Sequence, residues 1–175
     1  MRKLGMDELG RLSVDDFRQM PKNPVMVVLD NIRSMHNVGS VFRSADAFLC
    51  EGICLCGYTP QPPHRDIHKT ALGATESVDW LYFQRTLEAV EELKQRGYKI
   101  FAVEQAEGSI PLHRFNAGGE KLAIVFGNEV GGVDAEVLKH CDGCIEIPQL
   151  GTKHSLNISV AAGIVLWKLA EPKLA

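Results

Sequence analysis

The sequence predicts an α/β protein with a mostly parallel sheet and helices on both faces. Continuous apolar runs such as Val25–Asp30, VMVVLD, are typical of strands buried on both faces of a sheet. Segments with the apolar spacing of helices separate these runs, and polar or glycine-containing loops follow several of them. Ligands bind such sheets at the carboxyl ends of the strands, so three loops are candidate sites. The first loop leads into Asn37–Arg43, the second lies at Gly127–Gly132, and the third lies at Gln149–Ser155.

The composition is ordinary for a soluble globular protein. With 175 residues, 45% hydrophobic and 23% charged, the chain fits one domain with a buried core. The N-terminus lacks the apolar run of a signal peptide, so we expect a cytoplasmic protein with no membrane partner. Five cysteines, an odd number, fit a reducing compartment. Cys141 and Cys144 form one CxxC pair without a second pair at zinc spacing, so we expect no metal.

The charge balance leaves a nucleic-acid partner open. A net charge of −3 and a pI near 6.1 count mildly against one, because nucleic-acid proteins are usually basic. Two basic patches count in favour, one before the first strand and one in a proline-punctuated loop: Arg2, Lys3, Arg11, Arg18 and Lys22, then His64, Arg65, His68 and Lys69. Both patches also fit ordinary solvated surface.

The chain begins with a short N-terminal extension, residues 1–24, ahead of a domain predicted over residues 25–175. The extension contains a short amphipathic helix and a linker that ends at Pro24. After the first strand, apolar residues form one stripe of a helix: Val38, Val41, Phe42, Ala45 and Phe48. Asn37 stands at the predicted N-cap of this helix. Arg43 projects from its opposite face among small residues, where it is free to approach a ligand or is simply a solvated charge.

The later elements alternate in the same way. Three prolines, Pro60, Pro62 and Pro63, rule out regular structure where they stand, and a polar, turn-rich segment is predicted after them at His64–Thr75. Strands are predicted at Gly52–Tyr58, Val78–Phe83, Lys99–Glu104, Lys121–Phe126 and Cys144–Ile147, and helices at Thr86–Arg96 and Asp134–His140. Glycines directly after Phe126 allow the backbone to approach a ligand, although such turns also occur without one.

The last helix has almost no polar face. From Leu156 to Trp167 its apolar residues cover every direction around the axis, which is typical of a helix buried all round. It is too short to span a bilayer, which needs about 20 apolar residues. We therefore expect a second subunit to cover the side that the chain's own core leaves open. Ser155 precedes this helix, as an ordinary N-cap or as part of a functional loop.

Familiar nucleotide signatures are missing from the sequence. The absence of GxxxxGK[ST] counts against a P-loop, and the absence of GxGxxG in the first strand-helix unit counts against a dinucleotide fold or a Rossmann-type methyltransferase.

The three loops together resemble the motifs of the SpoU (TrmH) family in order and spacing. Asn37-x-Gly39-x-x-x-Arg43 follows the first strand, FGNEVGG follows a late strand, and IPQLGTKHSLNISVAAGI lies near the end of the chain. The family comprises S-adenosylmethionine-dependent RNA ribose 2′-O-methyltransferases of the SPOUT superfamily. The resemblance covers Val25–Leu169 and implies a SPOUT-type fold with a C-terminal trefoil knot that holds the cofactor. It also implies an active site completed across a homodimer.

The resemblance implies residue roles as well. Backbone groups near Gly127, Ile147 and Leu156 are expected to cradle S-adenosylmethionine. Arg43 matches the family's catalytic arginine, and four residues match its surrounding polar positions: Asn37, Glu129, Ser155 and Asn157. The family proposal makes Arg43 a general base, but a guanidinium stays protonated in nearly all proteins. Phosphate clamping and electrostatic help to the developing alkoxide are equal alternatives.

The reaction implied is methyl transfer to a ribose 2′-hydroxyl of tRNA or rRNA, with tRNA slightly favoured for a single-domain chain. The basic residues of the extension and the loop His64–Lys69 are then expected to flank the RNA. Two alternatives stay open: a non-catalytic RNA-binding or assembly factor that keeps the fold, and a SPOUT methyltransferase with another acceptor, such as a base or a protein.

Overall fold

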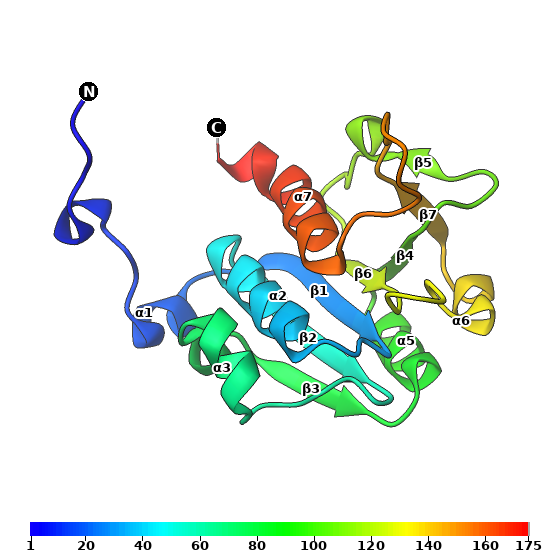
Figure 1. Cartoon of the computed structure of the whole chain (residues 1–175), viewed down its shortest axis with the longest axis horizontal. Coiled ribbons are helices and arrows are strands. Elements are labelled where there is room, and N and C mark those ends of the chain that lie inside the picture. The colour runs from blue at the N-terminus through cyan, green and yellow to red at the C-terminus, as the bar shows by residue number, and fades with distance from the viewer. Residues whose placement is uncertain (175) are drawn as a thin grey trace.

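The protein is described by a computed structural model that covers residues 1–174. Its centre is a seven-stranded sheet in the order β3-β2-β1-β6-β4-β7-β5, in which every neighbouring pair is parallel (Figure 1). The strands are β1 (Asn23–Asp30), β2 (Cys50–Cys56), β3 (Trp80–Phe83), β4 (Lys99–Val103), β5 (Ile110–Pro111), β6 (Leu122–Phe126) and β7 (Gly143–Glu146). The predicted α/β fold with a mostly parallel sheet is confirmed.

Helices cover both faces of the sheet, as predicted. The α-helices are α1 (Val14–Gln19), α2 (Met35–Ala47), α3 (Arg65–Ala71), α4 (Ala74–Ser77), α5 (Thr86–Gln95), α6 (Ala135–Lys139) and α7 (Ile158–Ala170). Short 3-10 helices lie at Met6–Leu9, Leu112–Arg114 and Glu171–Lys173. Figure 1 shows α2 and α7 side by side, and the start of the chain, with the 3-10 helix Met6–Leu9, lying away from the sheet.

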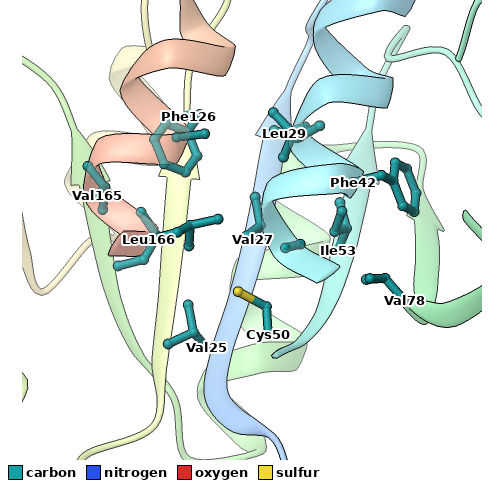
Figure 2. Packing of buried hydrophobic residues seen from close by; sticks show 14 of the residues in the cluster. Val25, Val27, Leu29, Phe42, Cys50, Ile53, Val78, Phe126, Val165 and Leu166 are labelled. Atoms are coloured by element: carbon teal, nitrogen blue, oxygen red, sulfur yellow. The ribbon is translucent and has the colours of Figure 1, made fainter. Parts of the chain in front are cut away.

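The two sides of the sheet have separate cores. On one side α2, α3 and α7 bury the larger cluster, and on the other α5 and α6 bury the smaller one. Figure 2 shows Phe126 of β6 beside Val165 and Leu166 of α7, with Leu29 of the neighbouring strand β1 in the same larger cluster. Because both faces are covered, the central strands consist of the continuous apolar residues seen in the sequence.

The strand register brings the candidate loops together. β1 and β6 are neighbours, with Leu29 opposite Phe126, and β4 lies on the other side of β6 with Val103 opposite Phe126. The chain therefore leaves these three strands at the same edge of the sheet. The loop before α2, the glycine turn after Phe126 and the segment after Val103 all lie there.

Several local predictions were wrong. The N-cap of α2 is Ser34, whose hydroxyl accepts from the amide of Asn37, so Asn37 lies inside the first turn instead of capping it. The segment His64–Thr75, predicted to be polar and rich in turns, contains α3 and the start of α4. Its helix was missed because polar residues cover most of a surface helix and only Ile67 and Ala71 are buried. β5 has two residues and gave no periodic signal. The trefoil knot stays a prediction.

The last helix is only partly enclosed by its own chain. Ala162, Val165 and Leu166 are buried, but Val160, Ile164 and Trp167 are 50%, 39% and 53% exposed. None of the helices in residues 1–174 is long and apolar enough to cross a membrane. One side of α7 thus presents apolar side chains that this chain does not cover.

Candidate active site

A cavity of about 630 Å³ opens where β4, β6 and β7 end and α7 begins. Two of its walls are loops that carry the second and third sequence motifs. Its lining includes Gly127, Gly132, Val133, Ile147, His154, Ser155, Leu156, Asn157 and Ile158. The three residues predicted to hold a cofactor by their backbone, Gly127, Ile147 and Leu156, therefore all line one cavity.

The glycine turn after β6 forms the first wall. Asn128 and Gly132 exchange two backbone hydrogen bonds of 2.9 Å, which closes a tight turn. A Cβ at Gly127 would overlap the backbone of Gly132 and Val133, and Gly132 itself has a φ of 69°. Both positions therefore require glycine, for close approach in the first case and for left-handed backbone in the second.

Two side chains fasten this turn to β1. The Asn128 amide donates to the carbonyl oxygen of Asn31 at 2.7 Å, and to the hydroxyl of Tyr58. The buried carboxylate of Asp30 accepts from the backbone amide of Asp134 at 3.0 Å and from the Thr86 hydroxyl. The first and second motif loops are thus held in a fixed relation to each other.

Glu129 connects these loops beside the cavity. Its carboxylate accepts from the amides of Arg33 and Ser34 at 3.1 and 3.3 Å, and from the Asn37 side chain at 3.1 Å. The Asn37 oxygen in turn accepts from the Asn157 side chain at 3.2 Å. Three residues of three different motifs form one hydrogen-bonded cluster, Asn37, Glu129 and Asn157, which we call the polar cluster.

The environment of Glu129 keeps its carboxyl ionised at neutral pH. Partial burial raises its pKa, but hydrogen bonds from the Arg33 amide, its own amide, the Asn37 side chain and the Ser34 amide lower it further, so the net pKa lies below its ordinary value. Glu129 therefore presents a fixed negative charge whose oxygens are occupied by donors.

Asn157, not Ser155, caps the last helix. Its side-chain oxygen accepts from the Ser159 amide at 2.9 Å, so the interpretation of Ser155 as an N-cap was wrong. Ser155 is exposed and lines the cavity two residues earlier. Four of the five predicted catalytic positions thus lie at this cavity or in the polar cluster beside it: Asn37, Glu129, Ser155 and Asn157.

Arg43 lies elsewhere. It is exposed on the outer side of α2, in a hollow shared with Lys69, Thr70 and Gly163 of α7. Within residues 1–174 it takes part in none of the ion pairs. Helix α7 packs along α2 (Figure 1), and the hollow that holds Arg43 is closed on one side by Gly163 of α7. A single chain does not bring Arg43 to the cavity.

Sequence reasoning missed two residues that follow β4. Glu104 and Gln105 both line the cavity, and each contacts one of its loop walls. The Glu104 carboxylate accepts from the Val133 amide at 3.2 Å, and the Gln105 side chain donates to the His154 carbonyl at 2.5 Å. The available signal was a polar pair directly after a buried strand, at the edge where ligands bind.

Some residues of the two basic patches form hydrogen bonds or ion pairs within the chain. Arg2 pairs with Glu8, Arg18 donates to the carbonyl of Glu76, and the His64 ring caps α3 by accepting from the Asp66 amide. Cys141 and Cys144 are half-buried free thiols, and burial raises the pKa of both. Among residues 1–174, no cluster of three or more histidine, cysteine or acidic side chains could hold a metal ion.

Known proteins are similar to this chain in sequence and in fold. The profile described as the SpoU rRNA Methylase family matches residues 24–167. The 23S rRNA (guanosine-2′-O-)-methyltransferase RlmB of Pasteurella multocida is 33% identical over 173 residues, which cover 96% of this chain and 68% of the relative. An uncharacterised tRNA/rRNA methyltransferase of Synechocystis is 33% identical over 162 residues, 93% of this chain and 41% of that one.

A solved structure extends the likeness to three dimensions. The AdoMet-bound rRNA methyltransferase of Sinorhizobium meliloti superimposes with a TM-score of 0.83 at 25% identity, over 91% of this chain and 61% of that chain. This chain thus spans between 41% and 68% of the length of these three proteins.

Proposed function

The chain belongs to the SpoU rRNA methylase family, and we propose that it transfers a methyl group from S-adenosylmethionine to a ribose 2′-hydroxyl of rRNA or tRNA. It is an S-adenosylmethionine-dependent RNA methyltransferase with an α/β SPOUT fold. The observation that carries the proposal is the convergence of three motifs on one cavity, with the polar cluster at its side.

The cavity fits S-adenosylmethionine by size and by chemistry. Its volume of about 630 Å³ lies within the range of roughly 300–1,000 Å³ that is usual for small-molecule sites. Gly127, Gly131 and Gly132 line this wall, and their lack of side chains leaves main-chain groups accessible there. Ile147 and Leu156 add apolar surface near the opposite wall. Such a site recognises a flat, partly apolar nucleoside through backbone hydrogen bonds.

The chain's own residues must align the acceptor and manage one proton. When bound, S-adenosylmethionine supplies an electrophilic methyl group on its sulfonium, so the 2′-hydroxyl needs orientation and loss of its proton as the new oxygen–carbon bond forms. Glu129 is a poor proton acceptor, because its pKa is lowered and its oxygens already accept from N–H donors. It instead orients Asn37, and through it Asn157.

Arg43 requires a second copy of the chain to take part. In one protomer it shares a hollow with Gly163 of α7, and the same helix exposes the apolar residues Ile164 and Trp167. An exposed apolar helix face of this kind is typical of a subunit contact. We propose a homodimer packed through this face, in which Arg43 of one protomer serves the cavity of its partner. There it holds an RNA phosphate or stabilises the developing alkoxide.

Mixed dimers test this arrangement. We would combine Arg43→Ala chains with Glu129→Ala chains, each inactive alone, by co-expression with two different tags. If the site is shared, each hybrid has one intact site, and the mixture regains about a quarter of wild-type methylation. If each chain carries a complete site, no hybrid is active and the shared site is refuted.

The RNA acceptor is identified by transfer of labelled methyl groups to purified tRNA and rRNA, followed by nuclease mapping of 2′-O-methylated positions. The name of the Pasteurella relative supports 23S rRNA, and that of the Synechocystis relative includes tRNA. The tRNA preference inferred from the single-domain chain stays a prediction. Binding of S-adenosylhomocysteine without transfer to either RNA would favour the non-catalytic alternative, and methyl transfer to a base or a protein would favour another acceptor.

A further inference from the structure

The segment after β4 reaches both loop walls of the cavity with consecutive side chains. The backbone amide of Glu104 donates to the Ile145 carbonyl at 3.1 Å, which fixes the segment to β7. From this anchored position Glu104 reaches the glycine turn, and Gln105 reaches the loop that precedes α7. No sequence motif of the cofactor site includes either residue.

The Glu104 side chain contacts the glycine turn from the β4 side. One oxygen of its carboxylate accepts from the Val133 amide at 3.2 Å, and the other accepts from the Gln105 amide at 2.9 Å. A Cβ at Gly132 would overlap the Glu104 carboxylate, so the carboxylate and the turn are packed in direct contact. The carboxylate thus sets the position of the turn relative to β4.

Gln105 fastens the opposite wall. Its side-chain amide donates to the His154 carbonyl at 2.5 Å, across 49 residues of sequence. The whole stretch from Gly151 to Asn157 is exposed. Within residues 1–174 the bond from Gln105 to His154 is the only hydrogen bond between this loop and the segment after β4. A long exposed loop with few internal bonds depends strongly on each tie to the body of the protein.

We propose that Glu104 and Gln105 are positioning residues that hold the two walls of the cofactor cavity in their binding arrangement. Gln105 acts as a latch on the loop that carries Ser155 and Leu156, and Glu104 acts as a support for the glycine turn. The inference rests on the proposed function for the identity of the cofactor. The latch itself is a property of the protein without cofactor.

The test measures loop opening and cofactor affinity separately. Lys153 is exposed beside the latched carbonyl, so trypsin cleavage of the bond after Lys153, followed by mass spectrometry without cofactor, reports opening of the loop. Calorimetry with S-adenosylhomocysteine reports affinity. Gln105→Ala should speed this cleavage and weaken S-adenosylhomocysteine by roughly two- to tenfold, the range for loss of one hydrogen bond. KM for S-adenosylmethionine should rise, with kcat little changed.

Two further variants separate the latch from other roles. Gln105→Glu has the same shape but sets a carboxylate oxygen against the His154 carbonyl, so it should open the loop at least as much as Gln105→Ala. Glu104→Ala should weaken S-adenosylhomocysteine without faster cleavage at Lys153, because it frees the other wall. Gln95→Ala, at an exposed glutamine ending α5, is the matched control and should change neither readout.

Each contrary outcome is decisive. Unchanged cleavage with weaker binding in Gln105→Ala would mean direct contact with the cofactor and would overturn the latch. Faster cleavage with unchanged affinity would show that the latch exists but would overturn its role in positioning the cofactor wall. Loss of kcat at intact affinity would overturn the positioning role. If wild-type protein fails to bind S-adenosylhomocysteine, the proposed function falls, while the cleavage rates still decide whether the latch exists.

Discussion

The polar cluster and Arg43 differ in how far a single chain prepares them. The cluster of Asn37, Glu129 and Asn157 is fixed by hydrogen bonds from three motifs and flanks a formed cavity. Arg43 lies six residues beyond Asn37 on the same helix, yet on an exposed face that shares a hollow with Gly163 of α7. One protomer therefore has the elements of a cofactor site, whereas in the proposed dimer Arg43 acts on the cavity of the partner.

This difference predicts that mutations in the two regions impair different steps, cofactor binding in one case and methyl transfer in the other. Changes around the cavity should weaken cofactor binding in each chain. Changes at Arg43 or on the exposed side of α7 should leave cofactor binding intact and remove methyl transfer.

Replacing Arg43 by alanine should give the largest loss. We expect kcat for RNA methylation to fall by about 100- to 1,000-fold, as when one preorganised donor to a developing oxyanion is removed. The affinity for S-adenosylhomocysteine should stay unchanged, because Arg43 lies outside the cavity of its own chain. Steady-state kinetics and calorimetry measure the two quantities. Arg43→Lys at close to the wild-type rate would refute a requirement for guanidinium geometry.

Gly127→Ala should show the opposite behaviour. Its added Cβ overlaps the backbone of Gly132 and Val133, so the turn must shift, and we expect about 10- to 100-fold weaker S-adenosylhomocysteine, from the usual cost of overpacking. Gly151→Ala is the control, since a Cβ there meets open space and the backbone is not left-handed. Calorimetry on both variants measures the effect. Equal affinities for the two would show that the close approach at Gly127 does not shape the cavity.

Trp167→Ala should weaken the dimer and leave each chain folded. Truncation of a buried interface tryptophan costs about 2 kcal/mol or more, which corresponds to a dimer dissociation constant raised by about 30-fold. Sedimentation across a concentration series measures it, and methylation should fall in parallel with the dimer. Tyr82→Ala removes a comparably exposed aromatic residue from the far strand β3 and should change neither. A fully active Trp167→Ala monomer would refute the shared site.

The sequence alone predicted much of the fold, because apolar runs and helix-period stripes report burial directly. β1, β6 and the central part of α2 follow from these patterns with small errors at their ends. The capping residues could not be predicted from these patterns. Ser34 and Asn157 cap their helices where Asn37 and Ser155 were plausible from spacing, since any of these polar side chains can cap and only the backbone path decides.

The site was predictable only where a motif marked it. Gly127, Glu129 and Asn157 could be named by resemblance, and the cavity brings them together. Glu104, Gln105 and Asn128 could not, because their partners are backbone groups up to 97 residues away, and a backbone partner leaves no signature in the sequence. The separation of Arg43 from the cavity could not be predicted either, since it depends on how α7 packs along α2.

Glu129→Gln should have the smallest effect, a change in stability that depends on pH. The folded-state pKa of Glu129 lies below its ordinary value, so its carboxylate stabilises the native state above the unfolded pKa of about 4.3, and this contribution is lost as pH falls through the folded pKa. At pH 7 Glu129→Gln should therefore unfold more easily by less than about 1 kcal/mol, because the group is largely exposed. Urea unfolding between pH 3 and 7 should show the two proteins converging toward the acid end. A difference that stayed constant over this range would mean that the Glu129 charge does not hold the first motif loop, and that shape alone holds the polar cluster.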